Sequence, residues 1–111
     1  MQFLLAIFAD DAVGVDPEFG LTCRAYEEAL RAAGVFVEGR RLQPASSAAT
    51  LRVRDGRRSV DDGPVSPAPA PLRGYIVVEV PSLHDALEWA ARCPAASRGV
   101  IEVRPILTRP Q

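Results

Sequence analysis

The apolar and polar positions of this chain predict four strands, two helices and one hairpin. Residues 3–9 and 75–80 are largely apolar at consecutive rather than alternate positions. A strand of that kind is covered on both faces, so we expect these two stretches at the centre of a sheet. Residues 35–38 and 99–105 carry more charge, and we expect them at the edges of the same sheet.

Each predicted helix begins at a residue that caps free backbone amides. Asp16 opens the first helix, which ends at Gly34, and Ser82 opens the second, which ends at Cys93. Apolar residues at steps of three and four give each helix one stripe that faces the core. The stripes are Phe19, Cys23, Tyr26, Leu30 and Ala33 in the first helix, and Leu83, Ala86, Leu87 and Ala90 in the second.

The segment between the two halves of the sheet predicts a β-hairpin. Residues 50–54 and 57–60 flank Asp55-Gly56, a dipeptide that favours a tight two-residue turn. Such a turn places Leu51 opposite Val60. The proline-rich residues 66–71 favour a polyproline II spacer.

This order of elements is typical of one α+β domain over residues 1–111: a ferredoxin-like, split βαβ sheet with an inserted β-hairpin. We expect the two central strands to be parallel and both helices to cover the same face. An apolar face then stays uncovered, formed by Leu4, Ala6, Phe8, Tyr75 and Val77 or their alternates. Either the hairpin or a second copy has to cover it, and we predict a two-fold homodimer.

Composition narrows the possible functions. The formal net charge of −1 attracts neither nucleic acid nor an anionic membrane. Two distant cysteines and a single histidine provide too few ligands for a Cys/His zinc site within one protomer. No motif predicts a metal or a cofactor. The apolar start is too short to cross a membrane and follows no basic leader, so we expect a cytoplasmic protein.

Short motifs along nearly the whole chain resemble one known family. They are Ala32-Ala33-Gly34-Val35, Leu42-Gln43-Pro44, Val53-Arg54-Asp55-Gly56, Asp62-Gly63-Pro64, Gly74-Tyr75, Ala86-Leu87-Glu88-Trp89-Ala90 and Ile101-Glu102-Val103-Arg104-Pro105. In this order they resemble the YCII-related, or DGPF-domain, proteins of bacteria. The resemblance implies a ferredoxin-like fold and dimers like those of the dimeric α+β barrels. Most members lack an assigned activity, some are dehydrochlorinases of aromatic substrates, and others are encoded beside extracytoplasmic-function sigma factors.

Two departures from the family pattern bear on function. Val65 replaces the phenylalanine of the DGPF motif, and residues 66–70 lack the polar side chains that usually follow it. Distant YCII members pair a histidine of the first helix with an aspartate as a proposed acid/base dyad. Here Thr22 and Cys23 fall in that helix instead, so that candidate for general acid/base catalysis is missing.

The candidate site residues each have a structural alternative. Asp62 and Glu38 are weak candidates for a catalytic base, and Arg40, Gln43, Asp62, Gly63 and Tyr75 for binding a ligand. Asp62 and Gly63 equally suit a turn, and Tyr75 suits a core position with a hydrated hydroxyl. Six arginines within residues 40–58 form either an anion patch or a solvated hairpin face; without aromatic residues among them, nucleic acid is not the expected partner.

Two functions stay open at this point. The first is a dimeric small-molecule-binding domain that regulates or senses, associated with sigma-factor systems. The alternative is a small lyase or isomerase, similar to a dehydrochlorinase, that acts on a cyclic organic substrate in a cleft between sheet, hairpin and partner subunit. The first rests on the scarcity of acid/base residues, and the second on the relatives alone.

Overall fold

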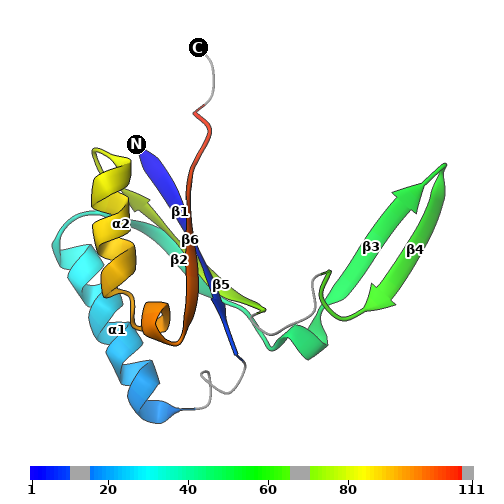
Figure 1. The fold of residues 1–111 in the computed structure, drawn as a ribbon, viewed down its shortest axis with the longest axis horizontal. Coiled ribbons are helices and arrows are strands. Elements are labelled where there is room, and N and C mark those ends of the chain that lie inside the picture. The colour runs from blue at the N-terminus through cyan, green and yellow to red at the C-terminus, as the bar shows by residue number, and fades with distance from the viewer. Residues whose placement is uncertain (11–15, 66–70, 109–111) are drawn as a thin grey trace.

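The computed structural model describes residues 1–10, 16–65 and 71–108. Figure 1 shows two helices on one side of a sheet, and a hairpin that stands apart from both. The elements, in chain order, are β1 (Gln2–Ala9), α1 (Pro17–Ala32), β2 (Phe36–Arg41), the 3-10 turn η2 (Ala45–Ser47), β3 (Ala49–Arg54), β4 (Arg57–Asp62), β5 (Leu72–Glu79), α2 (Leu83–Arg92), the 3-10 turn η3 (Pro94–Ser97) and β6 (Gly99–Pro105).

The four-stranded sheet has the order β2-β5-β1-β6, so β1 and β5 are central as predicted. Every neighbouring pair in it is antiparallel. The expectation that the two central strands run parallel was therefore wrong. Because α1 carries the chain across the sheet, β2 runs parallel to β1 at a distance of two strands. The strand that fills the gap between them, β5, runs in the opposite direction.

The core lies between this sheet and the two helices. Phe3, Leu5 and Val78 point from the sheet into it, and Leu30 meets them from α1; each is at most 1% exposed. Burying a side chain of this size contributes about 1.5–3 kcal/mol. Tyr26 of α1 completes the contact between the helices, because its hydroxyl donates a hydrogen bond of 2.6 Å to the Trp89 carbonyl oxygen.

The helix ends agree with the predicted caps. Asp16 accepts a hydrogen bond from the Glu18 amide, and the Ser82 hydroxyl accepts one from the Asp85 amide. Gly34 has the positive φ of 74° that a glycine after a helix supplies at little cost.

The predicted stripe of α2 was only half right. Ala86 and Ala90 are buried, whereas Leu83 and Leu87 are 47% and 48% exposed. Trp89 and Cys93 also pack on the core, so the buried face of α2 is rotated away from both leucines. Ala33, which the predicted stripe of the first helix included, comes just after α1 and is likewise exposed.

The hairpin β3–β4 forms a sheet of its own. Its register is the predicted one, with Leu51 opposite Val60. The possibility that it folds across the four-stranded sheet was wrong: it stands off from the body (Figure 1), and Leu51 and Val60 are 56% and 60% exposed. Leu42 continues the β2–β5 ladder by donating to the Arg73 carbonyl at 2.8 Å, so the chain leaves the sheet in the direction of its strands. The predicted polyproline spacer falls mostly on residues 66–70, outside the described residues.

The face of the sheet opposite the helices is apolar at its centre. The strand register places Leu4, Ala6, Phe8, Tyr75 and Val77 there, as expected. Ala6 and Val77 are 7% exposed between their larger neighbours, and the other three are half-buried. We call this surface the open sheet face; a second copy upon it stays a prediction. No helix within the described residues is long and apolar enough to cross a membrane.

Candidate functional site

Three of the predicted site residues gather on the open sheet face. The Tyr75 hydroxyl lies 3.5 Å from Glu38 Oε1. Arg40 is the cross-strand partner of Tyr75, on the edge strand β2. Glu38 and Arg40 are exposed and Tyr75 is half-buried. Tyr75 thus lies outside the core between the sheet and the helices, although the structural alternative expected it in a core position.

The other predicted site residues lie at the base of the hairpin. Asp62 ends β4 opposite Ala49 and is exposed. Gly63 has a φ of 101° and donates its amide to the Ala48 carbonyl at 2.8 Å. Gln43, just beyond β2, is exposed. Among the described residues, no hydrogen bond or ion pair connects these three with the Glu38–Tyr75 pair.

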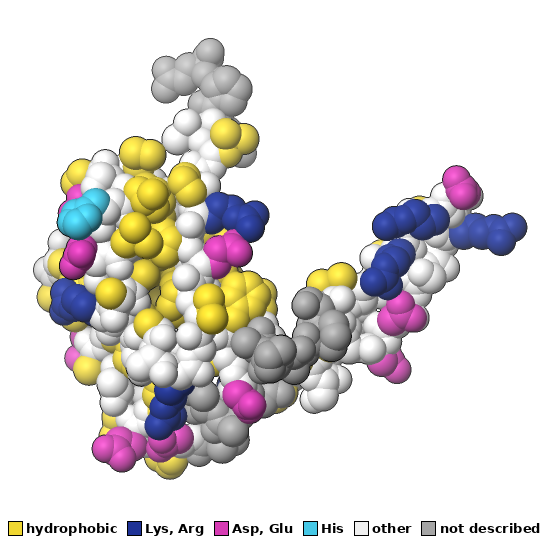
Figure 2. Space-filling model, viewed as in Figure 1, with side chains coloured by type: hydrophobic (Ala, Val, Ile, Leu, Met, Phe, Trp, Pro, Cys, Tyr) yellow, Lys and Arg dark blue, Asp and Glu magenta, His cyan; other side chains and the backbone are white. Residues whose placement is uncertain are grey.

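The hairpin arginines are largely solvated. Figure 2 shows dark-blue side chains along the hairpin, and Arg54, Arg57 and Arg58 are exposed. Arg52 is half-buried and donates to Asp61 Oδ2 at 2.8 Å across the two strands. This arrangement agrees with a solvated face rather than a built anion site.

A cavity of about 230 Å³ lies on the other side of the sheet, between α1, η3 and the strands β2 and β5. Two glycines on neighbouring strands, Gly39 of β2 and Gly74 of β5, are among its lining residues. The backbone comes close there, since a Cβ at Gly74 would lie 2.6 Å from the Arg40 carbonyl oxygen. The remaining lining residues are Ile7, Phe19, Cys23, Tyr26, Glu27, Phe36, Arg40, Arg41, Arg73, Ile76, Cys93, Pro94 and Ala95.

The lining of this cavity combines apolar and basic residues. Phe19, Phe36 and Ile76 are among the apolar ones, and Arg41 and Arg73 are among the basic ones. A smaller hollow of about 110 Å³ shares both arginines and extends towards Asp16. Guanidinium groups hold planar anions through paired charge-assisted hydrogen bonds, so the cavity combines the requirements for a ring and for an acidic substituent.

Both cysteines of the chain line the cavity as free thiols. Burial raises the pKa of the Cys23 thiol above its ordinary value, and the nearby Arg41 and Arg98 guanidinium groups offset part of that rise. Burial also raises the pKa of Cys93. Both thiols are therefore protonated at neutral pH, and neither is a ready nucleophile or base.

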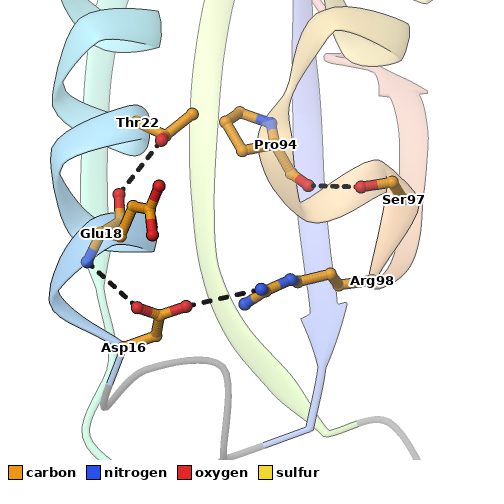
Figure 3. Close-up of polar contacts among 6 residues, drawn as sticks. All are labelled: Asp16, Glu18, Thr22, Pro94, Ser97 and Arg98. Carbon is orange, nitrogen blue, oxygen red and sulfur yellow. Dashed lines mark hydrogen bonds and ion pairs between the residues drawn. The ribbon is translucent and has the colours of Figure 1, made fainter.

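A set of polar contacts fixes the wall of the cavity that α1 and η3 form (Figure 3). The two carboxylate oxygens of Asp16 accept from the Glu18 amide at 3.0 Å and from the Arg98 guanidinium at 3.4 Å. Arg98 also lies 4.8 Å above the ring of Phe19. Asp16 thus caps α1 and connects it to the residue after η3. On η3 itself, Ser97 donates to the Pro94 carbonyl at 3.1 Å.

Of the candidate site residues that the sequence indicated, only Arg40 lines this cavity. A signal was present, because Phe19, Cys23 and Tyr26 share the predicted helix stripe that faces the sheet. Arg41 and Gly39 alternate with Arg40 along β2, and alternation sends them to the opposite face. Only the pairing of Arg41 with Gly74 shows that these residues meet one hollow.

The fold and the cavity define a class before any relative is considered: a ferredoxin-like α+β domain with a ligand-sized cavity beneath its first helix. The chain belongs to the YCII-related family, since the model of the YCII-related domain matches residues 1–109. An uncharacterised protein of Rhizobium meliloti (strain 1021) is 40% identical over 68 residues. That match spans 60% of this chain and 55% of the relative's own length.

The chain is similar in fold to solved structures, of which a dehydrochlorinase is an example. It is the 5-chloro-2-hydroxyhydroquinone dehydrochlorinase of Burkholderia phenoliruptrix AC1100, in complex with 2,5-dihydroxybenzoquinone. The TM-score is 0.57 at 16% sequence identity, over 96% of this chain and 94% of the dehydrochlorinase chain. At this identity the likeness concerns the fold alone.

Proposed function

We propose that this protein binds a small organic anion, a single ring with an acidic substituent, in the cavity beneath α1. The observation that carries the proposal is the union of apolar walls with Arg41 and Arg73 in about 230 Å³. An engineered apolar cavity of about 150 Å³ holds benzene, so this volume suits one substituted ring. We further propose that the protein is a homodimeric regulatory or sensing domain, and that it works with a sigma factor.

Binding without catalysis is favoured by the titratable groups around the cavity. The pKa of Cys23 is raised by burial, so the thiol keeps its proton at neutral pH. Glu27 Oε1 accepts a hydrogen bond from Arg31 Nη2 at 3.0 Å, so the carboxylate is engaged in an ion pair. General acid/base catalysis works best with a group that titrates near the working pH and reaches the substrate. The sigma-factor association rests on the resemblance alone, and its absence from native-host purifications of this protein would count against it.

A second candidate function is a lyase or isomerase similar to a dehydrochlorinase, which the fold of the Burkholderia enzyme favours. Its predicted bases, Glu38 and Asp62, lie outside the cavity lining. This alternative therefore needs a substrate on the open sheet face, against a partner subunit. Chloride release from a chlorinated hydroquinone that survives both Glu38→Gln and Asp62→Asn would remove these two residues from it.

The binding proposal is tested by calorimetric titration with benzoate, using benzyl alcohol as the neutral analogue of the same ring. We expect benzoate to bind more tightly than benzyl alcohol, because a charge-assisted hydrogen bond contributes about 1.5–3 kcal/mol. Arg41→Gln should weaken benzoate binding by about tenfold or more and leave benzyl alcohol nearly unchanged. Arg54→Gln, which removes an exposed hairpin arginine, is the matched control and should have no effect.

Two outcomes contradict the proposal. One is equal affinity of wild type and Arg41→Gln for benzoate, because the guanidinium then holds no anion. The other is no binding of benzoate, phenylacetate or salicylate up to about 10 mM, an affinity too weak for a built site.

A further inference from the structure

The hairpin β3–β4, residues 49–62, is here called the arm. It forms a separate two-stranded sheet, and no other element within the described residues packs extensively upon it. A two-stranded hairpin alone in water is at best marginally stable. The arm nevertheless has a complete ladder from Ala49–Asp62 to Arg54–Arg57. Its stability therefore calls for a contact that the single chain does not supply.

The two faces of the arm differ in character. Leu51, Val53 and Val60 form the apolar centre of one face, and they are 56%, 55% and 60% exposed; Arg58 and Asp62 lie at the two ends of that face. The opposite face carries Arg52 and Ser59 at the middle of the ladder. Alternation of apolar and polar residues is typical of a strand with one buried face. In the arm that face is still open to solvent.

The arm and the open sheet face lie on the same side of the molecule. Figure 1 shows the arm on the side of the sheet that the helices do not cover. The apolar residues of both surfaces are partly exposed, which shows that the two surfaces do not pack on each other within one chain. A two-fold axis satisfies both at once, since each copy then offers one arm and one open sheet face to the other.

We propose that the apolar face of the arm packs against the open sheet face of a second copy, and that the second copy's arm returns the contact. This inference rests on the proposed homodimer and assigns to it a contact beyond the sheet faces. Charge favours the same pairing, because Arg58 shares the apolar face of the arm, opposite Val53, whereas Arg54 and Arg57 lie on the other face. On the rim of the open sheet face Glu38 offers a carboxylate, whereas Glu79 pairs with the N-terminal ammonium at 3.6 Å and Glu102 pairs with Arg104. Opposite charges at the rim guide two surfaces into register.

Neighbouring residues of β4 provide a matched pair of variants. Val60→Asp places a carboxylate on the apolar face of the arm, and Ser59→Asp places the same carboxylate on the opposite, exposed face. Val60→Thr keeps the β-branched shape and replaces one methyl group by a hydroxyl. Sedimentation equilibrium under reducing conditions gives the dimer dissociation constant for each, and far-ultraviolet circular dichroism verifies that each chain is folded.

We expect a wild-type dimer whose dissociation constant rises by at least about tenfold in Val60→Asp and by about threefold in Val60→Thr, since central apolar contacts dominate interface energies. Ser59→Asp should stay within about threefold of wild type. Amide exchange in residues 50–61 of the wild type should slow as protein concentration rises, which a merely unravelled arm does not produce.

The outcomes separate this inference from the homodimer itself. A wild-type dimer that Val60→Asp and Ser59→Asp perturb equally, with arm exchange independent of concentration, overturns the arm contact and leaves the homodimer standing. A wild-type monomer at high micromolar concentration overturns both. Binding of benzoate in the cavity beneath α1 is independent of either result.

Discussion

Single side chains decide how α1 and α2 are held together. The Tyr26 hydroxyl donates a hydrogen bond of 2.6 Å to the Trp89 carbonyl oxygen. The rings of Tyr26 and Trp89 also meet edge to face, with centroids 6.5 Å apart. Burial raises the pKa of Tyr26 far above its ordinary value, so the hydroxyl stays a donor throughout the physiological range. The hydrogen-bond partner of this tyrosine was not predictable from the sequence, because Trp89 lies 63 residues away.

Tyr26→Phe removes this hydrogen bond and leaves the Trp89 carbonyl without its partner, while keeping the ring. We expect the free energy of unfolding to fall by about 1–2 kcal/mol, which corresponds to a melting temperature about 4–8 °C lower for a domain of this size. Tyr75→Phe is the control, because its hydroxyl lies 3.5 Å from an exposed carboxylate, and it should change stability by less than about 0.5 kcal/mol. Equal effects of the two variants in thermal unfolding would contradict the assigned role of Tyr26.

At the scale of elements, local chemistry predicted most of what the structure contains. The caps at Asp16 and Ser82, the glycine at the end of α1 and the register of the arm depend on neighbours within a few residues. The direction of β5 relative to β1 follows from the split βαβ topology, in which neighbouring strands are antiparallel, so the parallel expectation did not agree with the predicted fold. The rotation of α2 depends on packing between distant segments, and that expectation failed for this reason.

Two glycines test how differently the same substitution acts in a helix and in a strand. Gly20 of α1 has open space where a Cβ would lie, whereas a Cβ at Gly74 of β5 would lie 2.6 Å from the Arg40 carbonyl oxygen. Gly20→Ala should raise the free energy of unfolding by about 0.5–1 kcal/mol. Gly74→Ala should lower it by about 1–3 kcal/mol, because the two strands have to separate. Urea unfolding of both variants measures the difference, and effects of the same sign would contradict it.

For the whole molecule, the sequence predicted a sheet with one uncovered face but not the cavity or the position of the arm. The uncovered face follows from the number of elements, because the two central strands are apolar on both faces and the two helices cover only one face of the sheet. The cavity was not predictable because its lining brings Gly39 and Arg41 of β2 and Gly74 of β5 together with residues of α1. The molecule is flat, 47 × 45 × 18 Å in extent, and the arm stands apart from its body with apolar side chains that are more than half exposed.

That shape makes stability depend on protein concentration if a second copy covers the open sheet face. For a native dimer that unfolds to two chains, each tenfold rise in concentration adds about 1.4 kcal/mol to the apparent stability. Between about 2 and 200 μM the gain is about 2.7 kcal/mol. With a urea m-value of about 2–3 kcal/mol/M, the unfolding midpoint should move upward by about 1 M. A reducing agent keeps Cys23 and Cys93 from contributing intermolecular disulfides, and Val60→Asp should show a smaller shift. Midpoints that coincide at both concentrations would mean that the open sheet face stays in water.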